Sequence, residues 1–130
     1  LYYAAQVPIG VSPISNSVLF LKYAQNPFPT LFKRGLCVAL TTDDPLMFHT
    51  TPTPLLEEYA TARHAFALSS VDMCEIARNS VLQSGFEPRF KRHFLGEKYS
   101  SLVPGGHADS VGCAAPASSR AVAAASGARR

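Results

Sequence analysis

The chain has 130 residues, of which 47% are hydrophobic and 16% are charged. This composition excludes a highly charged, disordered chain as the overall class, and the length suffices for one ordinary domain but not for two. The net charge of +3 is too small to indicate a nucleic-acid partner. No apolar run approaches the roughly 20 residues that cross a bilayer, so the sequence predicts no transmembrane segment. Because the chain starts at Leu1 and not at Met, we expect a fragment or a processed product.

The composition changes at about residue 100. Residues 1–100 hold every aromatic side chain, whereas 20 of the last 30 residues are Ala, Ser, Gly or Pro. A segment of that kind cannot bury enough apolar surface to offset the entropy lost on ordering. We therefore predict a body over residues 1–99 and a low-complexity, disordered tail over residues 100–130.

Two short apolar runs predict buried strands. Val7–Val11 ends at a Ser-Pro pair, and Leu36–Leu40 is apolar at every position. An uninterrupted apolar run bounded by turn residues is typical of a strand that is covered on both faces, as in a parallel sheet. The segment between them predicts a short helix capped by Ser15 or Asn16, a turn or extended loop at Asn26–Pro29, and a helical turn over Thr30–Arg34.

Two helices are predicted after the second strand. Thr53 is a plausible N-cap followed by Pro54, and the apolar stripe of this helix comprises Leu55, Tyr59, Ala62 and Phe66. Ser69 and Asp72 have the spacing of a capping box, and the stripe of this second helix comprises Met73, Ile76, Ala77 and Val81. We expect Cys37 and Cys74 to be small core residues. A short basic helix is predicted over residues 87–94.

Alternating strands and helices indicate an α/β fold with a parallel sheet. Two strands cannot form such a sheet with both faces covered, so we expect the body to be the end of a larger α/β domain.

Asp43 and Asp44 are adjacent carboxylates directly after the second strand. Sites in α/β folds lie at the carboxyl ends of strands, and a cation would allow both groups to stay ionised. The local pattern also suits a simple turn, because Asp-Asp-Pro is favourable turn chemistry, and on local grounds the turn is the stronger interpretation. His49 could approach the same strand end, although an exposed or structural loop histidine is the stronger interpretation there as well. We expect His64 and His93 to face solvent.

The residues from Leu40 to His49 resemble the last metal-binding motif of the AMP deaminases, within the adenosine and AMP deaminase superfamily. The similarity covers residues 1 to about 99. It extends to Val7–Asn16, which resembles the family's seventh-strand segment, and to Asn26–Pro29, which resembles the loop that follows. It also includes Pro54–Tyr59 and Asp72–Phe86, which resemble the closing helices.

The resemblance implies a TIM (β/α)8 barrel, of which this chain would supply the last two strands. It implies zinc-dependent hydrolytic deamination of AMP to IMP and ammonia, with zinc held by three histidines and an aspartate. Asp43 matches the zinc-ligating aspartate, which can also orient the attacking water. Asp44 matches a residue that contacts the purine ring, and the adjoining substrate-contacting segment matches Pro45, Leu46 and Met47. Asp43 and Asp44 are thus the catalytic candidates of this chain.

The remaining zinc histidines and the catalytic glutamate have no match here, so we expect these 130 residues alone to be inactive. The alternatives are a non-catalytic, truncated deaminase fragment and adenosine deaminase activity. Family members are usually cytosolic and oligomeric, which implies a cytoplasmic location and a homo-oligomer for the full-length protein.

Overall fold

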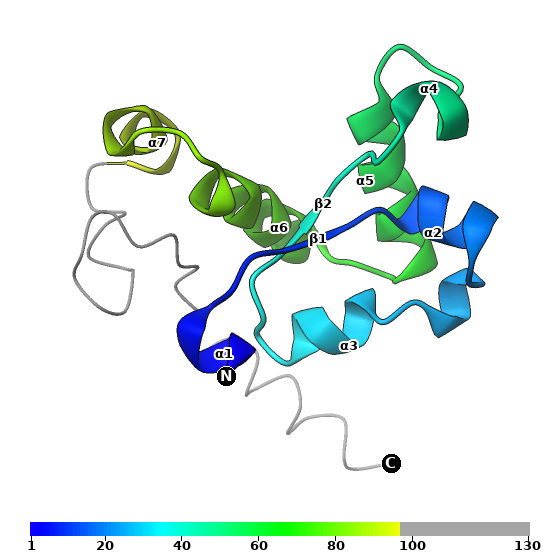
Figure 1. Cartoon of the computed structure of the whole chain (residues 1–130), viewed down its shortest axis with the longest axis horizontal. Helices are drawn as coiled ribbons and strands as arrows, with labels where there is room; N and C mark the ends of the chain where they lie inside the picture. Colours follow the sequence, from blue (N-terminus) through cyan, green and yellow to red (C-terminus); the bar gives the residue numbers. More distant parts are fainter. Residues whose placement is uncertain (97–130) are drawn as a thin grey trace.

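The computed structural model describes residues 1–96 (Figure 1). The predicted boundary at residue 99 and the predicted tail lie outside the described residues. In chain order the elements are α1 (Tyr2–Ala5), β1 (Ile9–Val11), α2 (Pro13–Leu19), the 3-10 helix η1 (Tyr23–Gln25), α3 (Phe28–Lys33), β2 (Val38–Leu40), α4 (Pro45–Phe48), α5 (Pro54–Ala65), α6 (Ser70–Gln83) and α7 (Pro88–Leu95). None of the helices within this range is long and apolar enough to cross a membrane.

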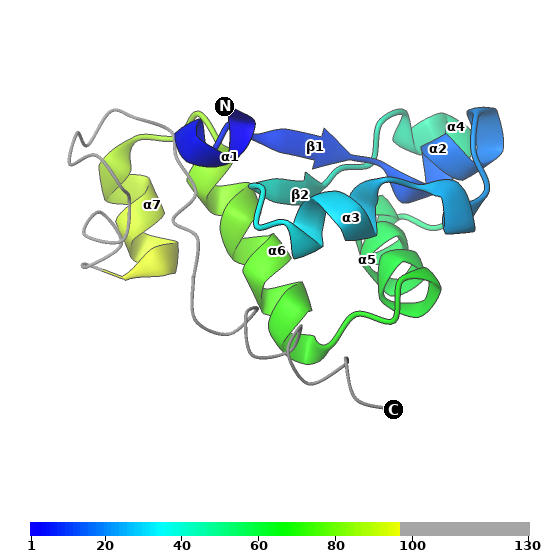
Figure 2. The same cartoon turned by 90° about the horizontal axis from the view of Figure 1, so that it is seen from below.

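The two predicted strands form a parallel pair, which confirms the α/β expectation. Gly10 lies opposite Ala39 in the register, and Thr41 N donates to the carbonyl oxygen of Val11 at 2.9 Å just beyond the paired residues. The pair is a two-stranded sheet within the described residues. Both strands point with their carboxyl ends toward α2, α4 and α5, while α1 and α7 lie at the opposite end (Figure 2).

The core lies around β2, whose three residues are all buried. The helices that face it contribute Phe28 and Phe32 from α3, Ala62 from α5 and Ile76 from α6. The ring of Phe28 stacks on that of Phe32 with centroids 5.7 Å apart. Apolar side chains thus surround β2, as its unbroken apolar sequence predicts.

One buried polar contact joins α6 to β2. Asn79 is 3% exposed, and its Nδ2 donates to the carbonyl oxygen of Val38 at 3.1 Å. The bond satisfies a strand carbonyl that would otherwise be buried without a partner.

Two predicted helix starts are wrong. The first helix begins at Pro13 with Ser12 in the N-cap position, so Ser15 and Asn16 lie inside it. Proline suits the first helical position because its missing N–H would have no intrahelical partner. The predicted loop at Asn26–Pro29 is also partly helical, since α3 begins at Phe28. Pro27 is the N-cap residue of α3, and just before it Asn26 Oδ1 accepts from Phe28 N at 2.9 Å.

The closing helices are confirmed, with differences in which faces are buried. Ser69 and Asp72 form the predicted capping box at the start of α6. Thr53 is the N-cap of α5, but its side chain makes no capping bond. The expectation of a core position is wrong for Leu55, which is 49% exposed, and for Cys74 and Ala77, which are exposed on α6.

Candidate active site at the strand ends

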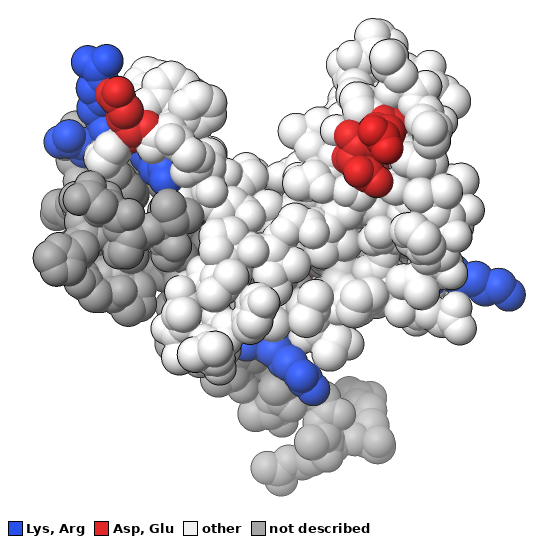
Figure 3. Space-filling view, in the orientation of Figure 1, with Lys and Arg blue, Asp and Glu red and all other residues white. Residues whose placement is uncertain are grey.

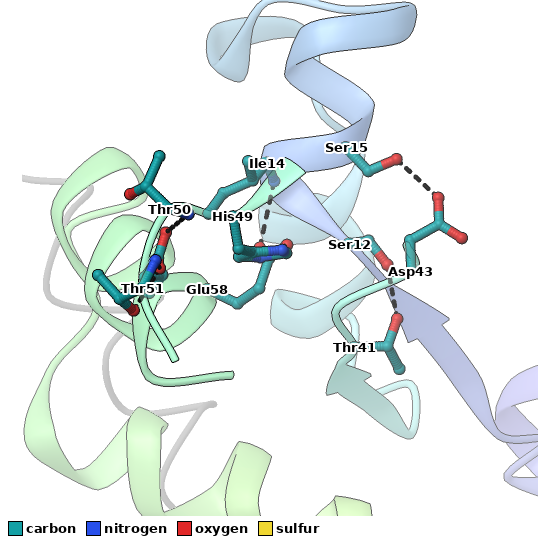
Figure 4. Close-up of polar contacts among 10 residues, drawn as sticks. Ser12, Ile14, Ser15, Thr41, Asp43, His49, Thr50, Thr51 and Glu58 are labelled. Atoms are coloured by element: carbon teal, nitrogen blue, oxygen red, sulfur yellow. Dashed lines mark hydrogen bonds and ion pairs between the residues drawn. The ribbon is translucent and has the colours of Figure 1, made fainter. Parts of the chain in front are cut away.

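Asp43 lies three residues beyond β2, with its backbone in the left-handed region at φ 53°. Aspartate is one of the few residues other than glycine that adopts this conformation readily. Its carboxylate oxygen Oδ2 accepts a hydrogen bond from the hydroxyl of Ser15 at 2.7 Å (Figure 4). Ser15 is fully buried in α2, whereas Asp43 is exposed. The carboxylate is therefore presented at the surface from a fixed position.

Asp44 and the next three residues form the start of a short helix. Asp44 is the N-cap of α4, and its carbonyl oxygen accepts from Met47 N at 3.0 Å. The predicted turn is thus real, but it opens a helix that the sequence did not predict. Leu46 is 102% and Met47 71% exposed, and Asp44 and Pro45 are exposed too. Leu46 and Met47 thus place two adjacent apolar side chains at the surface next to the acidic pair.

Acidic atoms gather on the face that contains the strand ends. In Figure 3 one group of acidic atoms lies over the region of α4 and α5, away from the visible Lys and Arg atoms, and a second group lies on the other side of the molecule, over the region of α7 and beside basic atoms. A surface of this charge attracts a cation or hydrogen-bond donors.

A second contact joins the two strand ends. The hydroxyl of Ser12, after β1, and that of Thr41, after β2, lie 2.6 Å apart. Gly10 provides the room for this arrangement, because a Cβ there would lie 3.1 Å from Cγ2 of Thr41. The absence of a side chain at position 10 therefore helps to set where Thr41 lies.

Glu58 and His49 form a buried polar pair beside these contacts. Both side chains are 0% exposed, and His49 Nε2 lies 3.1 Å from Glu58 Oε1. The other carboxylate oxygen of Glu58 accepts from Ile14 N at 3.1 Å. Burial raises the pKa of the Glu58 carboxyl, and the contacts with Ile14 and His49 oppose that rise. Of the two interpretations of His49, the structural histidine is confirmed and an approach to Asp43 is not observed.

Sequence reasoning missed Ser15 and Glu58. The sequence pattern favours a capping role for Ser15, and its hydrogen-bond partner lies 28 residues away, so no local pattern reveals the bond. Glu58 did carry a signal, since it precedes Ala62 by four residues and thus shares a helix face with a core position. Of the other histidines, His64 and His93 are exposed as predicted.

The described residues can supply part of a metal site. Among residues 1–96, no three His, Cys, Asp or Glu side chains converge to hold a metal ion. A catalytic zinc takes about three protein ligands, and carboxylate oxygen is one of the ligand types that zinc accepts. Asp43, exposed and oriented by Ser15, fits one ligand of such a site, and the other ligands would have to lie outside this range.

These features define a class of protein. It is an α/β protein with an oriented carboxylate at the carboxyl end of a strand. The model of the family described as AMP deaminase matches residues 1–112. The chain belongs to the AMP deaminase family.

Individual relatives are similar over most of this chain. AMP deaminase of Saccharomyces cerevisiae is 59% identical over 99 residues, which are 76% of this chain and 12% of the relative. AMP deaminase of Dictyostelium discoideum is 57% identical over 101 residues, 78% of this chain and 13% of the relative. AMP deaminase 1 of Homo sapiens is 52% identical over 107 residues, 82% of this chain and 14% of the relative. The chain thus spans only a small part of the length of these relatives.

Proposed function

We propose that these residues are part of a zinc-dependent AMP deaminase that hydrolyses AMP to IMP and ammonia. The observation that carries the proposal is the Asp43 carboxylate, exposed at the end of β2 and held by Ser15, in a chain of the AMP deaminase family. The relatives are named AMP deaminase, which supports AMP over adenosine as the substrate.

In this proposal Asp43 is a zinc ligand. When bound, zinc lowers the pKa of a water molecule to about 7 and so supplies a nucleophile at neutral pH. The oxygen of Asp43 that faces Ser15 receives a hydrogen bond, so the other oxygen is the one available for a metal or a water. The parallel strand pair supports the further proposal that the full-length protein is a TIM barrel, because active sites in barrels lie at the carboxyl ends of strands.

Asp44, Pro45, Leu46 and Met47 are the proposed substrate contacts. Leu46 and Met47 offer apolar surface for a purine ring, and the carboxylate of Asp44 can accept a hydrogen bond from a ring N–H or an amino group. We further propose that the 130 residues alone are inactive, since Asp43 cannot hold a catalytic zinc by itself. A cytosolic, homo-oligomeric enzyme remains the expectation for the full-length protein.

The test uses the full-length protein that carries these residues, with AMP and adenosine as substrates. Asp43→Asn, which keeps the shape and the tolerated backbone conformation, should lose both zinc and turnover. Asp44→Asn should keep its zinc and raise the KM for AMP. Glu87 is an exposed carboxylate at the N-cap of α7, so Glu87→Gln serves as the control. It should change neither the zinc content nor the turnover of AMP.

Wild-type zinc content in Asp43→Asn would refute the ligand assignment. Turnover of adenosine in preference to AMP would replace AMP deaminase with adenosine deaminase activity. A zinc-free protein that deaminates neither substrate would support the non-catalytic alternative.

A further inference from the structure

The segment from Asp43 to His49 is held by hydrogen bonds at both of its ends. At its start Asp43 accepts from Ser15 of α2, and at its end His49 contacts Glu58 of α5 at 3.1 Å (Figure 4). His49 N also donates to the carbonyl oxygen of Pro45 at 3.2 Å, which joins the histidine to α4 itself. Between these ends lie the exposed residues from Asp44 to Met47.

Glu58 also fastens the neighbouring loop after β1. Its Oε2 accepts from the backbone N–H of Ile14, which directly precedes Ser15. An N–H in the first turn of a helix has no intrahelical partner, so Glu58 satisfies a group that would otherwise be unpaired. The buried carboxylate of Glu58 therefore connects two segments. One is the start of α2, where Ser15 binds Asp43, and the other is His49, which follows α4.

A buried carboxylate contributes little net stability to a fold. Taking a charged group out of water is costly, and well-packed apolar side chains of similar size often give equal or higher stability. The side chains of Glu58 and His49 are both fully buried, and His49 Nδ1 has no hydrogen-bond partner among the described residues. We therefore look for the role of the His49–Glu58 pair in the loop positions that its contacts fix.

We propose that His49 and Glu58 are positioning residues, which hold the Asp43–Met47 loop in a fixed relation to the loop after β1. The assignment rests on the proposed function, because it concerns the alignment of the zinc ligand and substrate contacts proposed above. Neither residue touches the substrate; both act through the backbone of the loops that they join. A displacement of about 1 Å in such groups can lower a rate by about 100-fold.

The test measures kcat and KM for AMP, zinc content and backbone hydrogen exchange in the full-length protein. In His49→Ala, kcat/KM should fall by roughly 10- to 100-fold with normal zinc content, measured at a temperature where the variant is fully folded. The melting temperature should fall as well, because one buried oxygen of Glu58 loses its partner. Exchange should accelerate over residues 43–50 and remain unchanged in α6. His49→Gln should restore most of the loss, because its Nε2 can again donate to Glu58. His64→Ala, on the exposed face of α5, is the matched control.

Glu58→Leu separates positioning from stability. Leucine fills similar space without either contact, so kcat/KM should fall even where the melting temperature is preserved. Glu58→Gln should retain more activity, since its amide can still accept from Ile14 N. If Glu58→Leu does not fold, the His49 variants decide the question.

Unchanged kcat/KM and unchanged exchange in His49→Ala would overturn the proposal. So would a loss that merely follows the loss of folded or zinc-loaded protein, or one that His49→Gln does not restore. A wild-type protein without AMP deaminase activity would instead defeat the proposed function. Hydrogen exchange over residues 43–50 would still report whether the pair orders the loop.

Discussion

The hydroxyl of Ser15 donates to Oδ2 of Asp43 at 2.7 Å, from a fully buried position in α2 to an exposed carboxylate beyond β2. The two residues lie a few positions beyond the ends of the neighbouring parallel strands β1 and β2, so strand pairing brings them together. A ligand whose second oxygen is held in this way binds a metal with less loss of conformational freedom.

If Asp43 is the zinc ligand proposed above, Ser15→Ala should weaken zinc binding without abolishing it. Loss of a partner of a metal ligand typically lowers metal affinity or activity by about 10- to 100-fold. Competition with a zinc chelator, followed by turnover of AMP, measures the effect in the full-length protein. Ser17→Ala, two residues away on the same helix, should leave the chelator titration unchanged, and an equal shift in both variants would contradict the role of Ser15.

Gly10→Ala should displace Thr41. The new Cβ would lie 3.1 Å from Cγ2 of Thr41, closer than the two atoms can comfortably pack, and the bond between Ser12 and Thr41 would be disturbed. We expect lower activity and a lower melting temperature. Thr41→Ser in the same protein removes the clashing methyl and keeps the hydroxyl, so the double variant should recover both. A double variant as impaired as Gly10→Ala alone would argue against this contact.

The pH dependence of stability should change in Glu58→Gln. Burial raises the pKa of Glu58 in the folded protein above its ordinary value of 4.5, so the folded state binds that proton more tightly than the unfolded chain. Its contribution to stability is then fully present below pH 4.5 and is lost as the pH rises through the folded pKa. Urea midpoints across this range should show Glu58→Gln gaining on the wild type as pH increases. A constant difference would contradict the raised pKa.

Asn79→Ala should destabilise the packing of α6 on β2. The carbonyl oxygen of Val38 would lose its partner at 3.1 Å, and an unsatisfied buried polar group costs about 1–3 kcal/mol. Denaturant unfolding of the full-length protein measures the loss. Cys74→Ala, on the exposed face of the same helix, should change stability by no more than about 0.5 kcal/mol. Equal effects of the two substitutions would show that the contact is not responsible.

Local patterns predicted the elements that local physics determines. The unbroken apolar run at Leu36–Leu40 predicted a buried strand, although the paired part is only Val38–Leu40, and the spacing of Ser69 and Asp72 predicted the capping box. The start of α2 was wrong because Ser15 is a favourable cap in isolation, while Pro13 starts the helix earlier and Ser15 is used by Asp43.

The position of Asp43 and Asp44 after a predicted strand indicates a candidate site. The sequence does not predict the contacts that support this site. The contact of Glu58 with Ile14 joins residues 44 positions apart, and only the folded chain brings them together. In the sequence, Glu57 and Glu58 are two similar carboxylates in one helix. In the structure Glu58 is buried, whereas Glu57 accepts from Thr50 N and Thr51 N at the surface.

The double attachment of Glu58 bears on attempts to transplant the acidic loop into another protein. A graft of residues 40–49 would carry both aspartates and every proposed substrate contact, yet it would leave behind α5 and the first turn of α2. Such a loop would have the right side chains without the supports that orient them. A graft that keeps these supports must therefore extend at least from Ile14 to Glu58, well beyond the motif that is recognisable in the sequence.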